Sequence, residues 1–461
     1  MKKIQLTQEK LIEILGKSDD AETMEYYYNA VLKDEIEANQ YGALLALLLM
    51  LVRHYNEKLF VGKTIDPSAF FGVNALSLGT EYWKYKELLD KTNFIILMSK
   101  IHNENIPDKP LEEFSEIYSH AIFSFGEYLE FLGICENAIR INPNNALCNF
   151  LKSSIVELCY INKTPIEYKI ALLNYKKSLL ETYNPEELPF DIKAHNFIFN
   201  ECDSALSAFG ADVSKVNFTP VLETFEKTKE IVPEWTEEHD FCLRNKLLLN
   251  PLCNFGNFIE CSYEDFEELP ISNKAKMLFD EIIYDYKLCR GIAFSYYKSK
   301  NGVGKREMCM VYSYAYSIFD KLAYLFKIAF DLKMNEQQIG FTEEQLFNAN
   351  INGTQLKFKD IKNNNILPLY LIMKKVREKQ RITNALQVGT FEHNELRNTI
   401  NHKSVFYVKD AKLKRNSSML LQLARNAIIY SYMLLHSCPK GSYEEHTAVK
   451  TAFLDFLLSD N

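Results

Sequence analysis

The chain contains few of the residues that interrupt helices. Of its 461 residues only 16 are glycine and 13 are proline, whereas leucine, lysine, glutamate and alanine are abundant. Glycine and proline are the poorest helix formers, so their scarcity favours long helices over sandwiches of short strands. We therefore expect an all-α protein, with no sheet larger than two short strands.

Cysteine and histidine do not occur at the spacings that bind metals. The ten cysteines include no C-x-x-C pair, which argues against a zinc site and against a disulfide framework in a chain of this length. Scattered reduced cysteines indicate a cytoplasmic protein. We predict no metal and no cofactor, because no ligand spacing relates His120, His195, His239, His436 and His446.

The sequence also lacks a long apolar run. The longest, Ala43 to Val52, is far shorter than the roughly 20 residues of a membrane-spanning helix, and it is typical of a buried helix instead. Met1, Lys2 and Lys3 lead into polar residues rather than a signal segment. No membrane partner is expected.

Charge is divided unevenly along the chain. The net charge is −8, but residues 275–440 carry 26 Lys+Arg against 14 Asp+Glu, while residues 1–274 carry 26 against 43. A basic region beside an acidic one is typical of a protein in which one part binds phosphate. The other interpretation is that two regions of opposite charge dock on each other, and both interpretations can hold together.

Residues 1–110 are expected to form an N-terminal helical region. Apolar periodicity predicts helices over residues 7–15, 21–38, 40–55 and 82–103, with Pro107 and Pro110 ending the last. The glycine, proline and small residues of 61–71 predict a loop.

Residues 111–270 resemble tetratricopeptide-like helical repeats. Gly126, Tyr128, Ala138, Ile139 and Pro143 occupy the glycine, tyrosine, alanine, aliphatic and proline positions of one such unit. A second, degenerate unit starts near Lys152, and further helices are expected over 191–208, 221–231 and 236–249. The region is interpreted either as packed helical hairpins or as a groove that binds a protein partner.

Residues 275–440 are predicted to form a four-helix domain after a boundary near Pro270. Its helices are expected over residues 276–300, 306–333, 366–392 and 417–436. The polar, asparagine-rich stretch 335–365 is interpreted as an insertion or loop, and residues 441–461 as a C-terminal helix. Gly302 to Lys305 lack the full phosphate-loop pattern, which leaves nucleotide binding with weak support.

The candidate catalytic residues lie between the third and fourth of these helices. Arg397, Asn398 and His402 fall within one short polar stretch. An imidazole can take a proton from a ribose 2′-hydroxyl or give one to a leaving 5′-oxygen, and a guanidinium can bind a phosphate through two hydrogen bonds. His402 lies five positions after Arg397, so on one continuous helix their side chains would point roughly 140° apart.

An arginine, a polar residue, three further residues and a histidine resemble the motif of HEPN-superfamily ribonucleases. Arg397, Asn398 and His402 match that motif position by position, and the four-helix context agrees with it. The resemblance implies metal-independent RNA cleavage that leaves a 2′,3′-cyclic phosphate. It also implies a homodimer in which the two motifs meet, and a role in RNA processing, a toxin–antitoxin pair or antiviral defence.

Three further basic residues are predicted to contact the RNA: Lys403 beside the motif, and Lys375 and Arg381 in the basic run of the third helix. The alternative to a ribonuclease is a non-catalytic helical-repeat adaptor whose HEPN-like bundle dimerises or binds RNA. In that case, the complete set of Arg397, Asn398 and His402 would serve no purpose.

Overall fold

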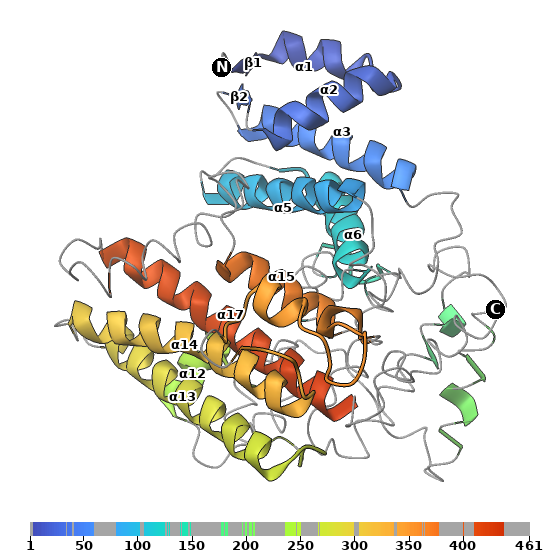
Figure 1. Cartoon of the computed structure of the whole chain (residues 1–461). Coiled ribbons are helices and arrows are strands. Elements are labelled where there is room, and N and C mark those ends of the chain that lie inside the picture. Colours follow the sequence, from blue (N-terminus) through green and yellow to red (C-terminus); the bar gives the residue numbers. More distant parts are fainter. Residues whose placement is uncertain are drawn as a thin grey trace.

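A computed structural model of the chain describes residues 3–59, 80–101, 106–124, 236–249, 266–298, 304–377 and 410–437 with small gaps, together with Ile400 and scattered positions between 127 and 207. Most of this described part is helical, and its named strands form a single two-stranded sheet (Figure 1). The predicted all-α class is confirmed.

The N-terminal region begins with a small parallel sheet and two short helices. Thr7 and Asp20 cap the helices by accepting hydrogen bonds from the backbone N–H groups of Lys10 and Thr23. The elements are β1 (Ile4–Leu6), α1 (Gln8–Leu15), α2 (Ala21–Leu32) and β2 (Ile36–Ala38), and Ile4 pairs with Ile36 in the sheet.

The predicted helix over residues 21–38 is therefore too long. It ends at Leu32, where the Lys91 ammonium binds the last carbonyls, with Nζ 2.7 Å from the Val31 oxygen and 2.9 Å from the Leu32 oxygen. A positive charge at the C-terminal end of a helix also interacts favourably with the helix dipole. The chain then turns, and Ile36 enters the strand.

Three longer helices complete this region. The apolar run around Ala43 lies in α3 (Tyr41–Leu59), which packs on α5 (Thr80–Ile101) and α6 (Asp108–Ser124). Leu47, Leu48 and Leu51 are almost fully buried, which confirms a buried helix. In the part of the chain that is described, no helix is long and apolar enough to cross a membrane.

The tetratricopeptide-like register remains a prediction, because Gly126, Tyr128 and Ala138 lie outside the described residues. Ile139 is helical and Pro143 lies in a turn. The Asn142 amide Nδ2 donates to the Glu112 carboxylate Oε1 over 2.7 Å. This bond ties the turn to the start of α6, as in a helical hairpin.

Four helices form the C-terminal bundle: α13 (Asn273–Lys298), α14 (Lys305–Ala329), α15 (Ile366–Arg377) and α17 (Asp410–Ser437). The helix α14 lies between α13 and α17, and α15 packs on the far side of α17 (Figure 1). Their order along the chain agrees with the predicted four helices. Residues 378–392 of the predicted third helix, and residues 441–461, lie outside the described part.

The described part of the predicted insertion or loop, residues 335–365, contributes several side chains to the core, while Asn352 to Gln355 are exposed. It contains η7 (Glu343–Phe347, a π-helical turn) and η8 (Phe358–Asp360, a 3-10 turn). Phe347 lies 5.7 Å from Phe358 and 5.2 Å from Tyr370 of α15, measured between ring centroids. The ring of Phe326 in α14 also lies 5.0 Å from that of Phe358. Aromatic contacts therefore join α14, the insertion and α15.

Candidate functional site

Five of the six residues predicted for the site lie outside the described part of the chain: Arg381, Arg397, Asn398, His402 and Lys403. Their predicted roles are not tested by the structure. Ile400, within the motif, is helical, half-buried and packed against the core. The helices that flank the motif in sequence, α15 and α17, are described.

The basic residues in the last turn of α15 are held by contacts inside the protein. The Lys374 ammonium lies 2.9 Å from a carboxylate oxygen of Glu343. The Arg377 guanidinium donates to the Tyr316 hydroxyl over 2.6 Å and also pairs with Asp320 of α14. The described part of this basic run therefore fixes α15 in place.

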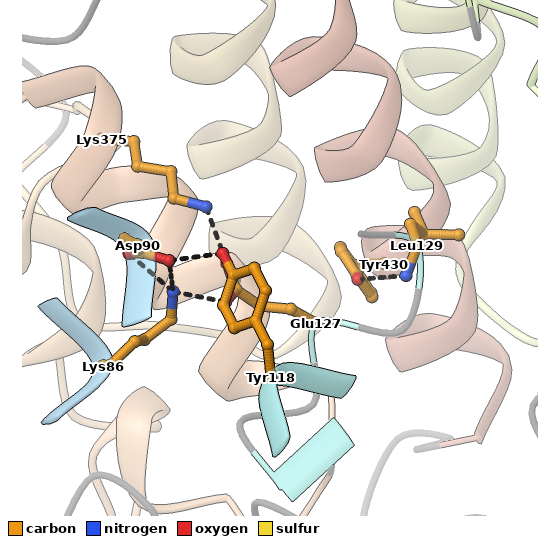
Figure 2. A network of polar contacts seen from close by, with 7 residues as sticks. All are labelled: Lys86, Asp90, Tyr118, Glu127, Leu129, Lys375 and Tyr430. Atoms are coloured by element: carbon orange, nitrogen blue, oxygen red, sulfur yellow. Dashed lines mark hydrogen bonds and ion pairs between the residues drawn. The ribbon is translucent and has the colours of Figure 1, made fainter. Parts of the chain in front are cut away.

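Lys375, the sixth predicted residue, belongs to a polar cluster centred on the buried carboxylate of Glu127. This cluster, the Glu127 network, consists of Lys86, Asp90, Tyr118, Glu127 and Lys375. Each Glu127 oxygen faces a lysine: Oε1 is 2.7 Å from Lys375 Nζ, and Oε2 is 2.8 Å from Lys86 Nζ. Lys86 also pairs with Asp90 at 3.1 Å, and the Tyr118 hydroxyl donates to Asp90 over 2.7 Å. Figure 2 shows the two lysines approaching Glu127 from different helices.

Burial makes this network sensitive to the loss of any member. The side chains of Lys86 and Glu127 are only 7% and 3% exposed. Burial by itself would raise the pKa of Glu127, but the two lysines outweigh it and lower that pKa to about 2. Burial would lower the pKa of Lys86, but Asp90 and Glu127 raise it above its ordinary value. Removing one partner of such a buried pair typically costs about 3–5 kcal/mol.

The same segment of the N-terminal region also contacts α17. Two residues after Glu127, the backbone N–H of Leu129 donates to the hydroxyl of Tyr430 over 3.1 Å. Tyr430 is fully buried and Leu129 nearly so. Glu127 and Leu129 thus bind one residue in each of the two helices that flank the motif (Figure 2).

The comparison with protein-family models identifies the C-terminal bundle. Residues 272–437, from the start of α13 to the end of α17, match the model described as LA2681-like HEPN. This region is a HEPN domain. No curated protein and no solved structure matches the chain. A HEPN domain is compatible with a ribonuclease role or a nucleotide-binding role.

A second contact surface joins the HEPN domain to the segment that follows α12 (Glu237–Arg244). The hydroxyl of Tyr286 donates to the Leu247 carbonyl over 2.8 Å, and Arg425 Nε donates to the Leu248 carbonyl over 2.6 Å. Gln422 binds the Asn245 carbonyl at 2.9 Å. Backbone carbonyls upstream of the HEPN domain thus accept hydrogen bonds from polar side chains of α13 and α17.

Charges of opposite sign meet between the two regions, as one interpretation of the sequence anticipated. Lys298 pairs with Glu237, Arg290 lies 3.8 Å from Glu238, and Lys375 pairs with Glu127. Part of the positive charge of the HEPN domain is therefore used to bind the acidic N-terminal region. Among the described residues no group of three His, Cys, Asp or Glu side chains could hold a metal ion.

Sequence patterns did not single out Glu127, Lys86 or Arg425. The only local signal is the spacing of Lys86 and Asp90, which lie four apart on α5 and therefore on one face. Lys375 was selected for its charge, and the structure adds an internal partner for that charge. Its predicted contact with RNA remains a prediction.

Proposed function

We propose that the protein is a metal-independent RNA endonuclease of the HEPN type. The observation that supports this most directly is the sequence position of Arg397, Asn398 and His402, between α15 and α17 of the HEPN domain. The order of the helices and the sequence of the motif both support this proposal. The activity, the motif and its residue roles are parts of the proposal.

In the proposed reaction, the ribose 2′-oxygen attacks the adjacent phosphorus and the bond from phosphorus to the 5′-oxygen breaks. His402 exchanges the proton, as base toward the 2′-hydroxyl or acid toward the 5′-oxygen. Arg397 binds the phosphate and stabilises the charge that develops on it, and Asn398 orients His402. The products are a 2′,3′-cyclic phosphate and a free 5′-hydroxyl. The nucleophile is internal to the RNA, so the step requires no metal.

The site is proposed to be completed by a second copy of the chain. One continuous helix would direct Arg397 and His402 roughly 140° apart, and a homodimer that brings two motifs together removes this difficulty. Sedimentation of the active protein tests the proposal, because a strict monomer with full activity contradicts it. We further propose that the N-terminal region responds to a protein partner or trigger, in a toxin or antiviral defence role.

The deciding experiment compares wild type and His402→Ala on total RNA, with and without EDTA. Cleavage by wild type in EDTA, loss of cleavage in His402→Ala, and a 2′,3′-cyclic phosphate on the product support the proposal. Wild-type protein that is folded but inactive on RNA contradicts it, as does cleavage that EDTA abolishes. A circular dichroism spectrum of each protein shows whether it is folded.

A non-catalytic adaptor is the second candidate. Three basic residues of the HEPN domain favour it: Lys374, Lys375 and Arg377. Each forms an ion pair with a carboxylate of the protein itself. In this case the protein binds RNA or a protein partner without cleaving RNA, and Arg397→Ala changes binding alone. The cleavage assay separates the two candidates.

A further inference from the structure

One short segment of the N-terminal region contacts both helices that flank the motif. Glu127 binds Lys375 in the last turn of α15, and the backbone of Leu129 binds Tyr430 in α17 (Figure 2). In sequence, α15 immediately precedes the stretch that carries Arg397 and His402, and α17 follows it. The two contacts therefore tie the last turn of α15 and the C-terminal half of α17 to one short segment.

The segment is itself attached to the N-terminal helices. Glu127 pairs with Lys86 of α5, Lys86 pairs with Asp90 one turn later, and Asp90 accepts a hydrogen bond from Tyr118 of α6. A displacement of α5 or α6 would be transmitted through Glu127 to α15. The connection is polar and directional, and its central residues Lys86 and Glu127 are almost fully buried, so it tolerates little rearrangement without breaking.

The ion pairs of Lys321 offer a comparison within the HEPN domain. Lys321 of α14 pairs with Glu281 and Asp285 of α13, but neither helix adjoins the motif in sequence. These ion pairs also join two helices, so a substitution of Lys321 provides a matched control. Disruption of either cluster lowers stability, whereas the Glu127 network, unlike the Lys321 pairs, also joins α5 to a helix next to the motif in sequence.

We propose that Glu127 is a positioning residue for the nuclease, through which the N-terminal region holds α15 and α17 in the arrangement that RNA cleavage requires. This inference rests on the proposed function. Glu127 acts through Lys375, without contact with RNA. Small displacements of catalytic groups reduce turnover strongly while binding survives. The effect of losing Glu127 is therefore expected in kcat rather than in KM.

The test uses the full-length protein and a fluorogenic RNA oligonucleotide. We expect Glu127→Gln to lower kcat about 10-fold or more and to leave KM within about 2-fold of wild type. Lys321→Met, the control, should keep the wild-type kcat at a temperature at which all the variants are folded. An unchanged kcat in Glu127→Gln overturns the inference, and so does an equal loss in Lys321→Met, because stability alone would explain such a loss.

A double variant distinguishes positioning from direct contact with RNA. If Glu127 acts through Lys375, the combination of Glu127→Gln with Lys375→Gln lowers kcat no further than the more severe single variant. If Lys375 instead binds RNA independently, Lys375→Gln raises KM, Glu127→Gln does not, and the two effects add. The second result overturns the inference.

Hydrogen exchange separates this inference from the proposed function. In Glu127→Gln, exchange should increase in residues 366–377 and 410–437 and remain unchanged in residues 273–298. This measurement requires no RNA cleavage. If wild type is inactive on RNA, the proposed function fails, and the positioning role in catalysis fails with it, whatever the exchange shows. If wild type is active but the exchange pattern and kcat of Glu127→Gln are unaltered, only the inference fails.

Discussion

Arg425 of α17 donates a hydrogen bond from its Nε to the backbone carbonyl of Leu248, 2.6 Å away, across 177 positions of sequence. Arg425 is among the largest fully buried side chains in the described structure, and Leu248 is equally inaccessible. A guanidinium removed from water requires acceptors, and here one of them is supplied by the segment that precedes the HEPN domain. The HEPN domain and the segment before it are therefore one folded unit at this surface.

Replacement of Arg425 is accordingly predicted to destabilise the whole chain. Arg425→Met retains much of the packing volume but leaves the buried Leu248 carbonyl without this donor, which typically costs about 1–3 kcal/mol. Denaturant unfolding followed by circular dichroism measures the difference in the free energy of unfolding.

Lys298→Ala is the control for Arg425→Met. It removes an ion pair with Glu237 that also joins the two regions but is largely exposed, and exposed pairs contribute about 0–1 kcal/mol. Equal effects of the two substitutions would show that burial of Arg425 does not matter. A larger effect of Arg425→Met is expected.

The Glu127 network predicts how stability depends on pH. Lys86 and Asp90 of α5, Tyr118 of α6 and Lys375 of α15 surround the carboxylate, and the lysines lower its pKa from an ordinary 4.5 to about 2. A lowered pKa in the folded state contributes stability that is complete above the unfolded pKa and is lost as pH falls toward the folded one. The contribution should therefore disappear between about pH 4.5 and about pH 2.

This dependence is measurable as the difference between wild type and Glu127→Gln. The free energy of unfolding should differ most near pH 7, and the difference should shrink as the pH falls through that range. Asp20, an exposed N-cap, gives the matched control Asp20→Asn. A difference for Glu127→Gln that is constant from pH 7 to pH 3 would contradict the assignment of a buried, charged carboxylate.

The helices of the HEPN domain were accessible to sequence reasoning because their apolar residues recur at helical spacing. The pattern of Ile318, Leu322 and Leu325 predicted a helix over residues 306–333, and all three side chains are fully buried in α14. Periodicity of this kind is a local property. It therefore identifies the helix and its buried face without knowledge of the partner helices.

Contacts between segments that are distant in sequence could not be predicted from local periodicity. Glu127 and Lys375 are 248 positions apart, and no local pattern indicates that they meet. The insertion shows a related difficulty. Its many asparagines predicted an insertion or loop but gave no sign that Phe341, Phe347 and Phe358 form part of the core. Three aromatic side chains outweigh a polar composition when they meet the aromatic residues of neighbouring elements.

The uneven distribution of charge predicts where RNA binds. We expect the basic residues of 275–440 to bind RNA, and the affinity to decrease as salt increases, because lysine and arginine displace counterions from phosphate. Fluorescence anisotropy of labelled RNA with the full-length protein measures the slope. An affinity that is equal at 50 mM and 200 mM salt would contradict an electrostatic interface.

Lys403 and Arg381 are predicted to contribute to this slope more than Lys374, which is paired with Glu343 inside the protein. Lys403→Ala and Arg381→Ala should each weaken binding and reduce the salt slope by about one ion. Lys374→Ala is the matched basic control. Equal losses in all three variants would indicate that total charge matters and that no particular residue does.

The proposed active pair gives the most specific prediction. Arg397→Ala and His402→Ala should each abolish RNA cleavage, because loss of a charge-stabilising donor or of the proton-transfer group typically costs on the order of 100-fold or more in rate. Arg397→Lys should also be severely impaired, since an ammonium cannot bind phosphate through two parallel hydrogen bonds. Asn398→Ala should retain more activity if Asn398 only orients His402. Activity should persist in EDTA.

His393, also on the approach to the motif, provides the control for His402. His393→Ala should cleave RNA at the wild-type rate, whereas His402→Ala should not, and thermal unfolding should show both variants to be folded. The dependence of kcat on pH should report a group that titrates near the ordinary histidine pKa of about 6.5 in wild type. Cleavage by His402→Ala at the wild-type rate would remove the basis for a HEPN-type mechanism, because no proton-transfer group would remain in the motif.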